Sequence, residues 1–213
     1  LNDPGSKQYD ELSTPDRDGY EKRAYLLLSK AVTLSKALGL NAREVRHVLT
    51  HPSDFGTLDL RKLPTQATDI NANALFNGFI NLSEYGELKF EFAGDGDGLI
   101  AIMEQARLAS PPDVPTLCKQ LASLTRRMPV VVQNVAAQLQ MTTPVDFSSV
   151  STLTRLWRAL QVVEKFGLQM GALKKWLTPK PDSIVAMGVR NTIKARYEPD
   201  AWQRVAKSIF DPL

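Results

Sequence analysis

Three observations predict an all-α fold for this chain. The expected architecture is an irregular stack of helical hairpins that resembles an α-solenoid or orthogonal bundle. Apolar residues recur at spacings of three and four along most of the sequence, as on one face of an α-helix. A helix–turn–helix phrase occurs twice, as LSKALGLNAREVRHVLTHP at 34–52 and as VVEKFGLQMGALKKWLTPK at 162–180. With 213 residues, 43% of them hydrophobic, the chain is long enough to bury a substantial core. Hairpins that each bury an apolar stripe on the next are typical of helical arrays.

The helical spacing begins at Tyr20. We therefore expect a flexible N-terminal segment over 1–19 and a helical-hairpin domain over 20–213, with two sub-bundles at 20–110 and 111–213 as an open alternative. The first residues have neither a basic n-region nor an apolar h-region, and no run approaches the roughly 18 apolar residues that cross a bilayer. These features predict a soluble protein that does not itself insert into a membrane.

The first hairpin combines a long helix with a short one. The long helix ends where Gly39 can take the left-handed conformation. Asn41, followed three residues later by Glu44, resembles a capping box and begins the short helix. His51 and Pro52 end it. The apolar stripe of the long helix comprises Ala24, Leu27, Leu28, Ala31, Leu34 and Leu38.

The repeat of this hairpin has an offset of 128 residues, which aligns Gly39 with Gly167. At that offset the apolar positions of the short helix match, whereas the surface positions do not. A fainter copy, LASLTRRMPVVVQNVAAQL at 121–139, breaks before Pro129 and lacks the turn glycine. The matched apolar pairs are Val45 with Leu173, Val48 with Trp176 and Leu49 with Leu177.

The remaining elements follow in chain order. Residues 51–73 are rich in Pro, Asp, Asn and Thr, so we expect a long ordered loop that packs its apolar residues on the hairpin. Helical spacing resumes at Leu75. The brief alternation in LKFEFAGDGDG at 88–98 leaves a short strand as a minor alternative. The loop residues expected to pack are Phe55, Leu58, Leu60 and Leu63, and the later helices are expected near 97–109, 114–127, 149–166, 182–196 and 199–210.

The candidate metal ligands do not form complete sets. His47 and His51 are four residues apart, but Val48 stands where a zinc protease has glutamate. Asp95 and Asp97 match the first and third positions of a calcium loop, whose twelfth position needs a bidentate glutamate and is Ala106 here. We expect Asp97 to cap the helix that starts near Leu99.

Other candidates for chemistry also have a structural explanation. The letters DFG at 54–56 occur in kinases, but the Gly-rich loop and His-Arg-Asp triplet are missing. Cys118, Trp157, Trp176 and Trp202 lie on apolar stripes and are expected in the core. No serine lies in a nucleophile-elbow pattern, although a spatially assembled triad stays open. We predict no catalytic residue, no cofactor and no metal, and hence no enzyme.

The charge is unevenly distributed along the chain. Residues 151–213 contain 11 Lys and Arg against 5 Asp and Glu, whereas residues 1–150 contain 15 against 18. One possible function is therefore a helical binding or regulatory module that contacts an acidic partner or nucleic acid through its basic C-terminal third. A dense basic run, or aromatics interleaved with arginine, is missing, which disfavours nucleic acid.

Several phrases resemble the A subunits of insecticidal Tc toxins and their relatives. LSKALGLNAREVRHVLTHPSDFGTLDLRKLPT at 34–65 is similar to a hairpin, a His-Pro loop and a Leu-Pro ending of that family. FINLSEYGEL, LTRLWRALQVVEKFGLQMGALKKWLTP and IKARYEPDAWQRVAKSIFDPL resemble successive later pieces, so that the resemblance covers most of 20–213. Arg126 departs from the pattern because it replaces a usual turn glycine. The matching motifs are structural and carry no catalytic residue.

The resemblance implies a non-catalytic piece of the α-helical shell that surrounds a translocation channel in a bell-shaped, secreted toxin particle. Its partners would be the remainder of its own large subunit and the neighbouring subunits of a homo-oligomer. The apolar stripe of the last expected helix is the candidate interface for such contacts. The residues of this interface are Trp202, Val205, Ile209 and Phe210.

Overall fold

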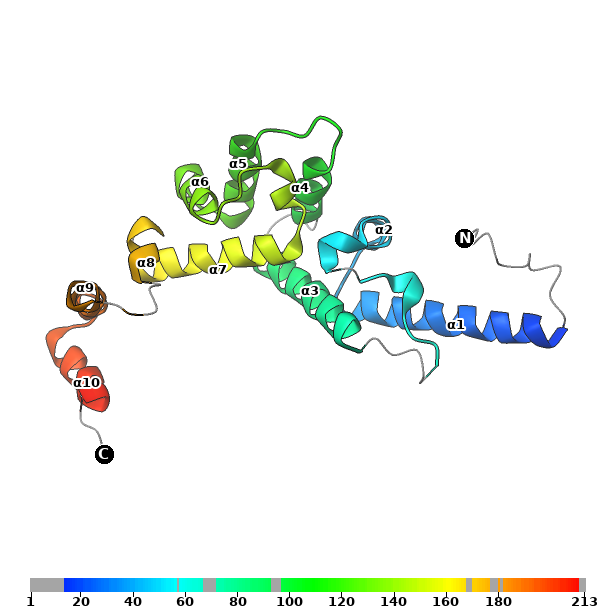
Figure 1. Cartoon of the computed structure of the whole chain (residues 1–213), viewed down its shortest axis with the longest axis horizontal. Coiled ribbons are helices and arrows are strands. Elements are labelled where there is room, and N and C mark those ends of the chain that lie inside the picture. The colour runs from blue at the N-terminus through cyan, green and yellow to red at the C-terminus, as the bar shows by residue number, and fades with distance from the viewer. Residues whose placement is uncertain are drawn as a thin grey trace.

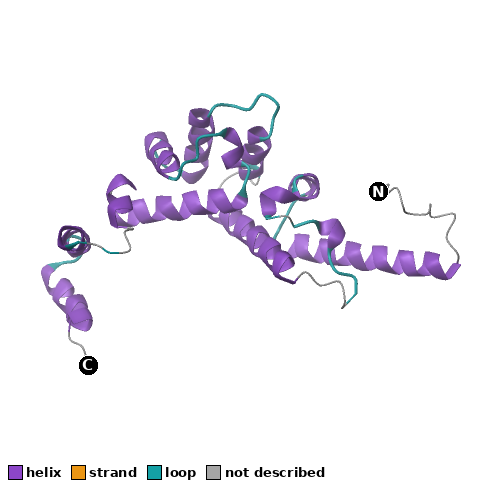
Figure 2. Ribbon diagram, in the orientation of Figure 1, coloured by secondary structure: helices purple, strands orange, loops and turns teal. Residues whose placement is uncertain are grey.

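The structure, a computed structural model, describes residues 14–56, 58–66, 72–92, 97–167, 170–176, 180 and 182–210. All regular elements within these residues are helical, which confirms the predicted all-α fold (Figure 2). The α-helices are α1 (Thr14–Ala37), α2 (Ala42–Thr50), α3 (Ala72–Glu91), α4 (Gly98–Ala106), α5 (Val114–Thr125), α6 (Pro129–Gln138), α7 (Val150–Phe166), α8 (Met170–Trp176), α9 (Ser183–Lys194) and α10 (Pro199–Phe210). Short 3₁₀ turns are η2 (Pro52–Phe55), η3 (Leu60–Lys62) and η4 (Pro144–Phe147).

The helices form an elongated, irregular arrangement (Figure 1). Helix α1 projects at one end of the molecule, and α9 and α10 lie at the other. Helices α3 and α7 pack on each other between these ends, while α4, α5 and α6 pack in sequence to one side of α7. The three-helix group and the α3–α7 pair therefore form the body from which the terminal helices extend.

One cluster of buried side chains runs from Val48 to Leu160. The cluster crosses position 110, where the sequence leaves open a division into two sub-bundles, because α4 packs directly on α5. Among its largest fully buried members are Phe55, whose ring meets that of Tyr85 edge to face at 5.4 Å, and Phe147. The loop after α2 thus contributes an anchor to the centre of the core.

The helix turns confirm the local predictions from the sequence. Gly39 and Gly167 end α1 and α7 with φ values of 61° and 62°, in the left-handed region that favours glycine. Asn41 and Glu44 form the expected capping box at the start of α2. The middle hairpin also turns through a left-handed residue, but there the residue is Arg126, with φ of 53°.

Some boundaries differ from the expectation. Helix α1 begins at Thr14, so that residues 14–19 are helical, and residues 1–13 lie outside the described part of the chain. The alternation at 88–92 does not form a strand, because α3 continues to Glu91. Leu88 and Phe92 are buried four residues apart on one helix face, whereas Phe90 points away and is 88% exposed.

Candidate functional site

The letters DFG at 54–56 belong to a loop that locks the hairpin onto the core. Asp54 is 1% exposed, and its Oδ2 lies 3.0 Å from Nε2 of His47, seven residues earlier in the chain. Arg107, just after α4, donates to Oδ1 of the same carboxylate. Burial alone would raise the pKa of Asp54, but the hydrogen bonds from His47 and Arg107 outweigh it and hold the pKa below its ordinary value. Asp54 is therefore a charged structural bridge between α2 and α4.

A second buried carboxylate connects α2 to α3. Glu44 is fully buried and accepts hydrogen bonds from the Tyr85 hydroxyl at 2.6 Å, from Lys89 Nζ at 2.8 Å and from the backbone N–H of Asn41 at 2.7 Å. Burial and, to a smaller extent, the hydrogen bond to Glu44 raise the pKa of Tyr85, so that the phenol stays protonated and donates its hydrogen. The capping box is thus also the polar attachment point of α3.

The candidate metal ligands have other roles in the structure. The ring of His51 stacks on that of His47 at 4.6 Å, and burial together with the nearby His47 lowers the pKa of His51. Among the described residues, no group of three or more His, Cys, Asp or Glu side chains is placed to hold a metal ion. Asp95 lies outside those residues.

Asp97 occupies the cap position of α4, but its side chain makes no capping hydrogen bond there, which corrects the sequence prediction. Its Oδ1 instead accepts from Asn41 Nδ2 at 2.6 Å, and its Oδ2 lies 3.4 Å from Arg43. Arg43 also donates to Glu104, so this surface cluster connects the start of α2 to α4. The long-range contact replaces the expected local one.

The residues expected in the core differ in how deeply the structure buries them. Cys118 is fully buried, and burial raises the pKa of its thiol to about 11. Trp157 is half-buried, with its ring edge to face with Phe92 at 4.9 Å and under the guanidinium of Arg127. The Trp176 side chain lies outside the description.

The predicted interface on α10 is described only in part. Trp202 is 9% exposed and its ring lies 6.1 Å from that of Tyr197, within the same C-terminal helical pair. Val205 is half-buried, and the side chains of Ile209 and Phe210 lie outside the described set. An interface on α10 remains a prediction.

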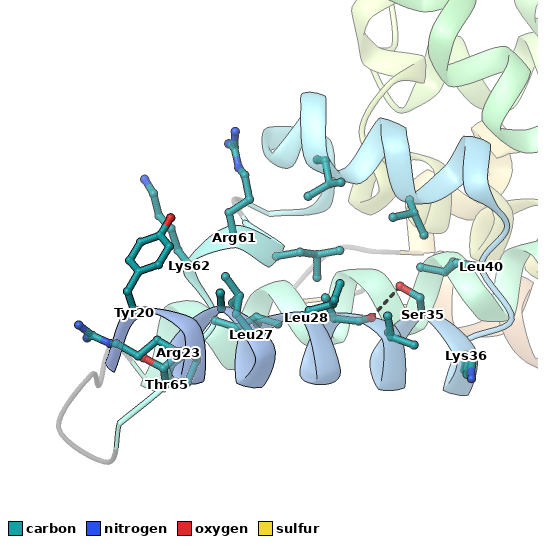
Figure 3. Close-up of a pocket in the computed structure, with 18 residues that line it drawn as sticks. Tyr20, Arg23, Leu27, Leu28, Ser35, Lys36, Leu40, Arg61, Lys62 and Thr65 are labelled. Carbon is teal, nitrogen blue, oxygen red and sulfur yellow. Dashed lines mark hydrogen bonds between the residues drawn. The ribbon is translucent and has the colours of Figure 1, made fainter. Parts of the chain in front are cut away.

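An open apolar groove of about 790 Å³ lies between α1, α2 and the segment 60–65 (Figure 3). One wall is the face of α1 from Tyr20 to Lys36, continued by Leu40 after the turn. The opposite wall consists of Val45 and Leu49 of α2 and the segment 60–65. Because Ser35 donates its hydroxyl to the carbonyl of Ala31, even this polar wall residue has its donor satisfied by its own helix.

The groove exists because the apolar stripe of α1 is longer than the core beneath it. Leu34 and Leu38 pack against the core, whereas Leu28, nearer the start of the helix, is 61% exposed. The segment after η3 is held to α1 by Lys30, which donates to the carbonyl of Pro64 at 2.5 Å, and by Arg23, whose Nε lies 3.4 Å from Thr65 Oγ1. These bonds fix the two walls relative to each other.

The sequence predicts the stripe on α1 but not the groove, because helical spacing does not distinguish a buried apolar face from an open one. Chemically, the groove offers an apolar wall with basic side chains at its edge, which suits a binding surface. In the described residues, no helix is long and apolar enough to span a bilayer. Comparisons with models of protein families, with curated proteins and with solved structures find no match.

Proposed function

We propose that this chain is a non-catalytic structural part of a large Tc-toxin-like A subunit, within the α-helical shell that supports a translocation channel. Its role in that shell is to form contacts with the rest of its subunit and with neighbouring subunits. The family resemblance of residues 34–65 and 193–213 motivates the specific assignment. An extracellular site of action is part of the same proposal.

The open apolar face of α1 is the observation that carries the scaffold role. Tyr20 is 54% exposed, Leu28 61% and Val32 41%, and all three line the groove. Soluble monomers rarely leave large contiguous apolar patches uncovered, and such patches commonly mark contact sites. A helix that projects from the body with such a face is suited to packing against a neighbouring protein segment (Figure 1).

The chemistry of the family-like loop also supports a structural role. His47 and Arg107 both hydrogen-bond to the buried carboxylate of Asp54, which joins two helices. Phe55 fills the core, and Gly56 ends η2 with φ of 66°. The most distinctive residues of the loop are thus used to hold hairpins together, as a shell element requires.

Electron microscopy of the natural protein that contains this sequence tests the proposal. An antibody epitope inserted after Ser110, in the exposed loop between α4 and α5, marks the position of the chain. We expect hollow, bell-shaped oligomers with antibody density on the outer helical wall, and the same particles without density when the epitope is omitted. Monomers, or oligomers without a central channel, would refute the shell assignment.

A further inference from the structure

The groove between α1, α2 and η3 has the properties of a helix-binding site. We propose that it binds an amphipathic α-helix of another protein segment, with acidic side chains that face the basic edge of the groove. The inference deepens the proposed scaffold role by naming the chemistry of the partner. It rests on that role only for the identity of the parent assembly.

The shape of the groove matches a helix. Its α1 wall extends over the 17 residues from Tyr20 to Lys36, which corresponds to about 24 Å at the helical rise of 1.5 Å per residue. A docked helix of about 16 residues, or four to five turns, has the same length. Grooves that accept helices are recognised by apolar anchors at spacings of three and four residues.

The lining favours an apolar helix face over a small polar ligand. Ala24, Leu27, Leu28 and Ala31 present such a spacing along α1, and leucine and valine side chains of α2 face them (Figure 3). Sites for small molecules usually add a few convergent polar groups that fix the orientation of the ligand. The hydroxyl of Ser35, by contrast, donates to its own helix.

The charge of the lining selects an acidic partner. Four of the eighteen lining residues are basic and none of the eighteen is acidic. Arg23, Arg61 and Lys62 gather with Tyr20 at one end of the groove (Figure 3). Arg61 is paired with Asp59 at 2.9 Å, so part of its charge is already compensated, while Arg23 and Lys62 add to the positive potential.

The same charges disfavour a second copy of the chain as the occupant. Two grooves facing each other would bring their basic edges together. The exposed apolar residues Ile184 and Met187 of α9 belong to a helix that also carries Arg190 and Lys194, so docking α9 would again juxtapose like charges. An acidic helix meets neither obstacle.

Fluorescence anisotropy with two synthetic 18-residue peptides tests the proposal. Both have leucines at spacings of three and four, and the polar face carries glutamates in one peptide and lysines in the other. We expect the glutamate peptide to bind the intact chain at least tenfold more tightly at low salt, with a difference that shrinks as salt screens the charges.

Matched variants locate the binding site. Leu28→Asp places a charge in the groove, whereas Leu26→Asp makes the same change on the same helix outside the groove, at a residue that is 39% exposed. We expect Leu28→Asp to weaken the affinity for the glutamate peptide at least tenfold and Leu26→Asp to change that affinity less than twofold. The double variant Arg23→Glu and Lys62→Glu should reverse the preference toward the lysine peptide. Circular dichroism establishes that each variant remains helical.

Several results would overturn the proposal. Equal affinities for the two peptides would refute the acidic character of the partner. Equal effects of the two aspartate variants would show that the peptide does not bind in the groove. Sedimentation equilibrium that shows a dimer, dissolved by Leu28→Asp but not by Leu26→Asp, would assign the groove to a second copy. None of these results depends on the shape of the natural particle, so failure here is distinct from failure of the shell assignment.

Discussion

Replacement of Asp54 by asparagine should destabilise the fold more than any surface charge change. The side chain is 1% exposed and bridges His47 and Arg107. Hydrogen bonds to charged groups contribute about 1.5–3 kcal/mol each, and removal of one partner of a buried ion pair costs about 3–5 kcal/mol. Because asparagine keeps the shape and one acceptor, we expect a loss near the lower limit, about 3 kcal/mol.

Urea denaturation followed by circular dichroism measures this loss. With a slope of about 2 kcal/mol per molar urea, the midpoint should fall by about 1.5 M. Asp59→Asn is the matched control, since the partner of Asp59 is the exposed guanidinium of Arg61 and asparagine caps a helical turn equally well. The control should lose at most about 1 kcal/mol. If the two variants lost equal stability, Asp54 would not be the buried bridge described above.

The same carboxylate gives a pH dependence with a defined sign. The pKa of Asp54 is lower in the folded state than its ordinary value of 3.8. The ionised carboxylate therefore contributes to the free energy of unfolding fully at pH values above that ordinary value. The contribution is lost as pH falls through the lowered folded-state pKa. The stability difference between the wild type and Asp54→Asn should therefore be constant at neutral pH and shrink below about pH 4. A difference that grows on acidification would contradict this linkage.

Three further predictions follow from single residues. Gly39→Ala should lower the stability by about 1 kcal/mol because φ is positive at this position. Gly86→Ala inside α3 should raise the stability by about 0.5–1 kcal/mol, since the nearest atom to an added Cβ is 3.7 Å away. Melting temperatures that shifted in the same direction for both variants would contradict this. The thiol of Cys118, with its pKa raised to about 11 by burial, should react with a thiol reagent at pH 8 only after unfolding, and rapid labelling of the native protein would show that the site opens. A chelator should leave the melting temperature unchanged because Asp97 is bound to Asn41, and a rise of several degrees on adding calcium would restore the loop around it as a candidate site.

The local features of the fold were predictable because their causes are local. A glycine at the end of a stripe and an Asn-x-x-Glu start define the hairpin of α1 and α2, and both appear as predicted. Arg126 shows the limit of this reasoning. A non-glycine residue takes the left-handed turn there, where α5 packs on α6 and the next residue, Arg127, donates its backbone N–H to the carbonyl of Ala122.

The long-range polar contacts had no signal in the sequence. Asp54 and Arg107 are 53 residues apart, and Glu44 and Tyr85 are 41 apart, so that only the packing of the helices brings them together. The groove depends on tertiary structure in the same way. Leu28 and Leu34 belong to one helical stripe, yet only Leu34 packs against the core.

Hydrogen exchange measured by mass spectrometry tests the central claim, that the chain is a scaffold with a contact face on α1. Residues 20–36 are compared between the isolated chain and the assembled natural protein, with residues 114–125 of the already packed α5 as the internal control. Covered helices open less often and exchange more slowly. We predict marked protection of 20–36 on assembly with little change in α5. Equal exchange of 20–36 in the two states would show that the groove is not a contact surface and would contradict the account.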